Sequence, residues 1–119
     1  MSEATNRPQR PLPERRGTIR RLANSFASVE CRRGSMGLGA DIVVACVDIA
    51  EGGIGLVVNA GLMVGDVVEL TFHAQGFGRP VKRGATVVWR TGAGQDLWRA
   101  GLTFDKALSY SELQRLTTS

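Results

Sequence analysis

Short apolar segments interrupted by glycine fill the chain from about Phe26 onward, and this pattern constrains the fold more than any other feature of the sequence. In 96-DLWRAGLTF-104 apolar and polar residues alternate, so that one face of an extended chain carries Trp98, Ala100, Leu102 and Phe104. Similar segments predict strands at about 24–31, 40–49, 53–58, 66–73, 80–90 and 96–104. Short strands of this kind are typical of an all-β domain.

A chain of 119 residues is long enough for one domain with a modest core. Six strands in an open sheet would leave two exposed edges, and closing the sheet removes them. Together with the 15 glycines, this favours a closed or nearly closed structure. We therefore predict an all-β fold, a small antiparallel barrel of six to seven strands, in a domain that spans residues 23–119.

The segment 108-LSYSELQRL-116 departs from the strand pattern and predicts a short C-terminal helix. Ser109 and Glu112 have the spacing of a capping box, and leucines flank it in the manner of a hydrophobic staple. We expect this helix to pack against the barrel through residues that lie near one face, namely Tyr110, Leu113 and Leu116.

Positive charge is concentrated at the N-terminal end of the chain. Residues 1–33 carry eight arginines and three glutamates, a net charge of +5, whereas the rest of the chain carries a net charge of −1. This asymmetry predicts an anionic partner at the N-terminal end. The first 13 residues include three prolines and almost no apolar side chains, so they cannot bury enough surface to become ordered alone. We expect residues 1–22 to form a flexible basic arm.

Signatures of catalysis are missing from the sequence. It contains no glycine motif of the Walker or Rossmann type, no zinc-protease motif and no nucleophile-elbow motif. His73 is the single histidine, and it lies on the expected polar face of a strand without the partners of a metal site or a catalytic triad. We therefore predict no catalytic residues, no metal site and no cofactor, and a protein that is not an enzyme.

Cys31 and Cys46 are the two cysteines, and neither belongs to a Cys-x-x-Cys or Cys/His cluster. Both lie in or beside apolar segments, which predicts reduced, packed thiols. The sequence contains no signal-peptide core after its polar N-terminus and no apolar segment of membrane-spanning length. We expect a cytoplasmic protein.

Trp89 and Trp98 are candidates for stacking on a nucleotide base. They lie beside valine and leucine in alternating segments, so core packing is the better prediction for both tryptophans. We expect Lys82 and Arg83 to be solvated charges at the end of a strand or loop.

Two segments contain groups that suit an anionic ligand. The arginines of 13-PERRGTIRR-21 carry planar forks that can bind a phosphate or the O6/N7 edge of guanine. In 48-DIAEGGIG-55, an acidic residue ends an apolar segment and three glycines follow within seven positions. Glycine permits close backbone approach, so such a loop can admit a flat or phosphorylated ligand, although a plain turn would give the same pattern.

These residues resemble those of a PilZ domain, the bacterial receptor module for cyclic di-GMP. The family combines an R-x-x-x-R motif with a later [D/N]-x-S-x-x-G motif. The segment 16-RGTIR-20 matches the first motif, and 48-DIAEGG-53 matches the second except at Ala50, where the family has serine. The resemblance covers about residues 14–116, because 61-GLMVGDVVELTF-72, VVW at 87–89 and AGLTF at 100–104 also resemble the barrel strands of the family.

The resemblance implies that the arginines form one half of a clamp around the ligand and that Asp48 to Gly53 form the other half. Arg16 and Arg20 would hold phosphates and guanine edges, and Asp48 would accept hydrogen bonds from N1 and N2 of a guanine. An arginine at the position of Arg15 goes, in PilZ domains, with a mutually intercalated pair of nucleotides. This implies up to two cyclic di-GMP molecules per chain.

The resemblance also implies roles for the loop. Gly52 and Gly53 would let the backbone come close to the ligand. Ala50 carries a methyl group where the family has a hydroxyl, so one hydrogen bond to the ligand would be lost, a cost on the order of 1 kcal/mol.

Three functional hypotheses follow. The first is a non-catalytic cyclic di-GMP receptor in which the ligand fastens the arm to the barrel and so relays the second-messenger level to a partner protein. The alternative is a degenerate PilZ-like protein-interaction module that does not bind the nucleotide. A barrel that binds nucleic acid is disfavoured, because the expected strands lack an exposed row of aromatic residues.

Overall fold

The computed structural model describes residues 21–22, 27–34 and 38–117. They form six strands and one helix: β2 (Ala27–Arg33), β3 (Val43–Ile49), β4 (Gly53–Val58), β5 (Val67–Ala74), β6 (Val81–Gly94), β7 (Leu97–Phe104) and α1 (Tyr110–Thr117). The predicted all-β fold with a short C-terminal helix is confirmed. Most of the predicted arm, residues 1–22, lies outside the described residues, and only Arg21 and Leu22 belong to them.

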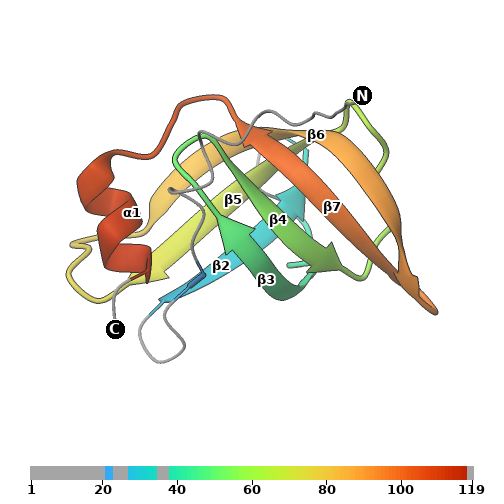
Figure 1. The fold of residues 1–119 in the computed structure, drawn as a ribbon, viewed down its shortest axis with the longest axis horizontal. Helices are drawn as coiled ribbons and strands as arrows, with labels where there is room; N and C mark the ends of the chain where they lie inside the picture. Colours follow the sequence, from blue (N-terminus) through green and yellow to red (C-terminus); the bar gives the residue numbers. More distant parts are fainter. Residues whose placement is uncertain (1–20, 23–26, 35–37, 118–119) are drawn as a thin grey trace, which may run out of the picture.

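The strands form one antiparallel sheet in the order β2-β5-β6-β7-β4-β3, which curls into a nearly closed barrel (Figure 1). The two edge strands meet where the backbone N–H of Ile42 donates to the carbonyl oxygen of Cys31 at 2.9 Å. Beside this bond, the Asp41 carboxylate accepts hydrogen bonds from the N–H groups of Cys31 at 2.9 Å and Val43 at 3.1 Å. The edge strands of the barrel are therefore joined partly by a side chain, because the Asp41 carboxylate accepts hydrogen bonds that a backbone carbonyl group would accept in a regular strand pair.

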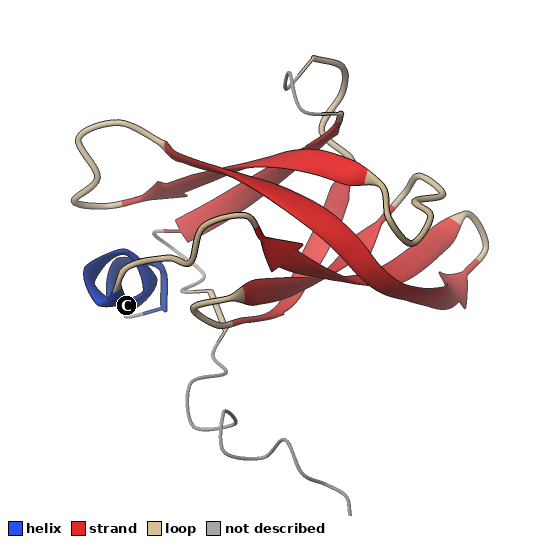
Figure 2. Ribbon diagram, turned by 90° about the horizontal axis from the view of Figure 1, so that it is seen from above, coloured by secondary structure: helices blue, strands red, loops and turns tan. Residues whose placement is uncertain are grey.

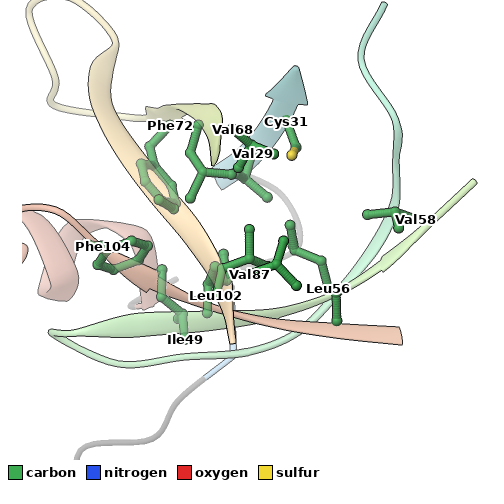
Figure 3. Packing of buried hydrophobic residues seen from close by; sticks show 14 of the residues in the cluster. Val29, Cys31, Ile49, Leu56, Val58, Val68, Phe72, Val87, Leu102 and Phe104 are labelled. Atoms are coloured by element: carbon green, nitrogen blue, oxygen red, sulfur yellow. The ribbon is translucent and has the colours of Figure 1, made fainter. Parts of the chain in front are cut away.

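The core lies inside the barrel and is built from the inward residues of the strands (Figure 3). In β7, Ala100, Leu102 and Phe104 are buried while Arg99 and Thr103 are exposed, so the predicted alternation is confirmed. Phe104 also packs edge-on against Phe72 of β5, with ring centroids 5.9 Å apart. Burial of these apolar side chains is the main stabilising term of the barrel.

Helix α1 covers the end of the barrel opposite the tip of the β6–β7 hairpin (Figures 1 and 2). The capping box is confirmed: Ser109 Oγ accepts from the Glu112 N–H at 3.0 Å, and Glu112 Oε1 accepts from the Ser109 N–H at 2.9 Å. Leu113 and Leu116 are buried, but Tyr110 is 61% exposed, so the prediction that it faces the barrel is wrong. At 3.6 residues per turn, Tyr110 lies about 120° around the helix from Leu116. Among the described residues, no helix is long and apolar enough to cross a membrane.

Arg83 of β6 fixes the connection between β7 and α1. Its Nε donates to the carbonyl oxygen of Lys106 at 2.9 Å, and its Nη2 contacts Glu112 Oε1 at 2.7 Å. The Arg83 side chain is only 12% exposed. The expectation that Arg83 is a solvated charge is therefore wrong, whereas the neighbouring Lys82 is exposed as expected.

Candidate functional site

The loop between β3 and β4 contains the second predicted motif. Asp48 lies near the end of β3, and the N–H of Ala50 donates to the carbonyl oxygen of Gly53 at 2.9 Å, which closes the turn. The turn is also held from outside, because the carbonyl oxygen of Gly52 accepts from Phe104 at 2.9 Å and that of Glu51 accepts from Leu108 at 2.8 Å. The motif is thus a fixed part of the barrel surface.

Asp48 belongs to a row of four paired residues on the outer surface. Asp48 of β3 pairs with Gly55 of β4, Gly55 pairs with Gly101 of β7, and Gly101 pairs with Trp89 of β6. The row faces outward, because the strand neighbours of the two glycines point into the core. Adjacent strands lie about 4.8 Å apart, so the row spans roughly 14 Å. We call Asp48, Gly55, Gly101 and Trp89 the cross-strand row.

Each glycine of the row is covered by the side chain at the nearer end of the row. A Cβ atom on Gly55 would lie 2.8 Å from Asp48 Oδ1, and a Cβ atom on Gly101 would overlap the Trp89 indole. Gly53, just beside the row, also needs to be glycine, because its Cβ would lie 2.5 Å from the carbonyl oxygen of Leu102. Gly55 and Gly101 are therefore buried, and the Asp48 carboxylate and the Trp89 indole form the outer surface of the row above them.

This surface forms the floor of an open groove of about 390 Å³. Its lining comprises Asp48, Ala50, Gly53, Ile54, Gly55, Val88, Trp89, Gly101 and Leu102. The volume falls in the range of small-molecule sites. Asp48 supplies a half-buried acceptor, and the described lining contains no basic side chain, so a ligand with negative charge needs cations from outside this lining.

Trp89 was expected in the core, and this prediction is wrong: the side chain is 43% exposed on the outer surface. The reason is a β-bulge in β6. Val87 pairs with Leu102 and Trp89 pairs with Gly101, which leaves Val88 as an extra residue and turns Trp89 to the opposite face. Trp98 is half-buried and packs against the core, as predicted.

The structure brings together only part of the predicted site. Asp48, Ala50 and Gly53 line the groove, and Gly52 is exposed in the adjoining turn. Arg15, Arg16 and Arg20 lie outside the described residues, so their position relative to Asp48 is not part of this structure. The sequence signal that could have revealed Trp89 is the glycine at position 101 within a strand, since an outward glycine there makes room for a neighbouring side chain.

The two cysteines, Cys31 and Cys46, are free thiols. Cys46 Sγ donates weakly to the carbonyl oxygen of Asp48 at 3.6 Å. Burial, with a smaller effect of the Asp48 charge, raises the pKa of Cys46 to about 12. Burial, with a smaller effect of the Asp41 charge, raises the pKa of Cys31 to about 12. Both thiols are therefore protonated near neutral pH, and the thiolate, the nucleophilic form, is disfavoured.

Comparison with known protein families decides what kind of domain carries this groove. The model of the PilZ domain family matches residues 14–119, nearly the whole chain. The chain belongs to the PilZ domain family. No curated protein and no solved structure matches it. PilZ domains are generally linked to cyclic di-GMP binding and are generally non-catalytic receptors. The match begins at residue 14, so it includes the arginine segment as well as the barrel.

Proposed function

We propose that this PilZ domain is a non-catalytic cyclic di-GMP receptor that relays the level of this second messenger to a partner protein. The observation that carries the proposal is the cross-strand row, in which a carboxylate and an indole flank two glycines on the outer surface of the barrel. The family match supports the choice of ligand.

The chemistry of the row suits a guanine base. A guanine presents N1–H and N2–H donors on one edge, and the two oxygens of Asp48 can accept both. Gly55 and Gly101 add no side chains of their own, so the carboxylate and the indole can lie flat against the barrel and leave room for the ring. Trp89 leaves 43% of its surface exposed, and indole is a strong stacking partner for a base. One base therefore finds a hydrogen-bonding partner and a stacking partner on one surface.

The charge of the ligand requires the arginine segment. Cyclic di-GMP carries two phosphates, and the described groove lining offers one carboxylate and no cation. We propose that Arg16 and Arg20 supply charge-assisted, bidentate hydrogen bonds to the phosphates. Arg15 would contact a second, intercalated nucleotide.

The alanine at position 50 supports a second candidate function, that of a PilZ domain that acts only through contacts with other proteins. Ala50 lines the groove, so the hydroxyl that the family motif supplies is missing from the site itself. The loss of one hydrogen bond, about 1 kcal/mol and up to about twice that for a charged acceptor, weakens binding without abolishing it. The receptor remains the better proposal, because the other groups of the motif are present in the sequence.

Calorimetric titration of the whole chain tests the proposal. We expect saturable binding of cyclic di-GMP and little heat from GTP or single-stranded DNA. Asp48→Ala should weaken binding by tenfold or more, since it removes a charged acceptor. Asp105→Ala is the matched control, because Asp105 also lies over a glycine, Gly84, on the outer surface. Absence of cyclic di-GMP binding by the unsubstituted chain would favour the protein-interaction module.

A further inference from the structure

Arg99 lies beside the groove on the same outward face. It precedes Gly101 by two residues in β7, and it pairs with Val57 of β4 and Thr91 of β6. Side chains two residues apart on a strand point to the same face and are separated by roughly 7 Å. The long Arg99 side chain therefore starts one step along the strand from the glycine floor.

Arg99 is available to a ligand. Its side chain is exposed, and among the described residues it makes no ion pair or side-chain hydrogen bond. The described groove lining holds a carboxylate and no compensating cation. A nucleotide in the groove beside Asp48 and Trp89 would thus lie next to an arginine that has no competing partner in the described part of the chain.

We propose that Arg99 binds a phosphate of the nucleotide in the groove. This inference rests on the proposed function and adds a ligand contact outside both sequence motifs. Arg99 projects from a strand that is paired on both sides, so the sheet fixes its backbone before a ligand binds. An anion contact from a rigid strand avoids the cost of ordering a segment of chain. The barrel therefore carries its own contribution to phosphate binding.

Arg90 provides a matched control on the same hairpin. It follows Trp89 directly and is exposed like Arg99. Arg90 pairs with Ala100, whose side chain points into the barrel, so Arg90 projects from the face opposite to Trp89 and Arg99. Substitution of either arginine changes the net charge equally, and only Arg99 lies on the groove side.

The test is calorimetric titration of cyclic di-GMP into the whole chain and into Arg99→Ala and Arg90→Ala variants, at low and at physiological ionic strength. Arg99→Ala should weaken binding by about tenfold or more and reduce its dependence on salt, because a charge-assisted hydrogen bond is lost. Arg90→Ala should bind within about twofold of the unsubstituted chain, since only a screened long-range charge is removed.

Arg99→Lys separates phosphate binding from guanine recognition. Lysine keeps the charge and loses the planar fork, so this variant should keep the salt dependence of binding and lose only part of the affinity. Loss of both the affinity and the salt dependence, to the level of Arg99→Ala, would contradict the phosphate assignment. Equal affinities of the Arg99→Ala variant and the unsubstituted chain would overturn the inference and leave the proposed function intact. Absence of binding by the unsubstituted chain would overturn both.

Discussion

Gly55 and Gly101 face each other across β4 and β7, and each lacks a side chain for a related reason. Asp48 extends over Gly55 from one neighbouring strand, and the Trp89 indole extends over Gly101 from the other. The cross-strand row is therefore a set of mutually dependent residues. A side chain at either glycine would displace the polar or the aromatic group that gives the groove its chemistry.

Gly101→Ala should destabilise the barrel and move the indole. The new Cβ would overlap Trp89, so the side chain or the strand must shift, at a cost of about 1–3 kcal/mol. Gly92→Ala is the control in the same hairpin, because a Cβ there would meet nothing within 4 Å. Chemical denaturation followed by tryptophan fluorescence measures both effects. Equal stability of the two variants would show that the indole does not rest on Gly101.

Ala50→Ser should tighten cyclic di-GMP binding by roughly five- to tenfold, or about 1–1.4 kcal/mol. Ala50 lines the groove, so a hydroxyl at this position can donate to a phosphate or ribose oxygen. Ala93→Ser, at an exposed position of β6, should leave affinity unchanged. Calorimetry compares the three proteins. Unchanged affinity in the Ala50→Ser variant would mean that position 50 does not contact the nucleotide.

Among the elements, β6 shows most clearly what a sequence pattern can and cannot predict. The strand was expected at 80–90 and extends to Gly94, because pairing with β7 continues through exposed threonine and glycine that carry no apolar signal. Ala85, Val87 and Trp89 are spaced two residues apart, so simple alternation would place all three on the same face of the strand. The bulge at Val88 interrupts the alternation and places Trp89 on the opposite face. A bulge is set by pairing between strands, so alternation within one segment cannot predict it.

The attachment of α1 to the barrel should depend on Arg83. Arg83→Ala removes the hydrogen bond to the Lys106 carbonyl and leaves the partly buried Glu112 without its cation, so we expect a loss of about 2 kcal/mol of stability. Lys82→Ala, one residue away and exposed, should change stability by less than about 0.5 kcal/mol. Thermal and urea unfolding provide the comparison. Similar stabilities of the two variants would show that the Arg83 contacts are not stabilising.

At the scale of the whole molecule, the sequence predicted the architecture well and the site in part. The barrel, the strand order along the chain and the capping box follow from alternation and spacing, which are local properties. The closure by Asp41 and the outward position of Trp89 depend on contacts between distant segments, so they were not predictable from one segment alone. The position of the arginine segment relative to Asp48 stays a prediction, because Arg16 and Arg20 lie outside the described residues.

Global stability should fall in alkaline solution because of the two thiols. Burial raises the pKa of Cys31 and Cys46 from 9.0 to about 12. Well below pH 9 both thiols are protonated in the folded and unfolded states, so they add no pH dependence. Between pH 9 and about 12 only the unfolded state loses these protons, and stability therefore decreases as the pH rises.

Urea unfolding of the unsubstituted chain and of a Cys46→Ala variant, below pH 9 and within this alkaline range, measures the effect. The variant should lose less stability than the unsubstituted chain over the same change in pH, since one thiol no longer titrates. An equal loss in both proteins would assign the alkaline destabilisation to other groups.

The most direct test of the account is an NMR titration of the isotope-labelled chain with cyclic di-GMP. We predict that the backbone amides of Asp48, Gly55 and Gly101 and the indole N–H of Trp89 shift together and saturate with one apparent affinity. The amide resonance of Gly84, a glycine that lies under Asp105 elsewhere on the barrel surface, should not shift. Shifts that spare the cross-strand row, or no shifts at all, would contradict the claim that this surface binds the nucleotide.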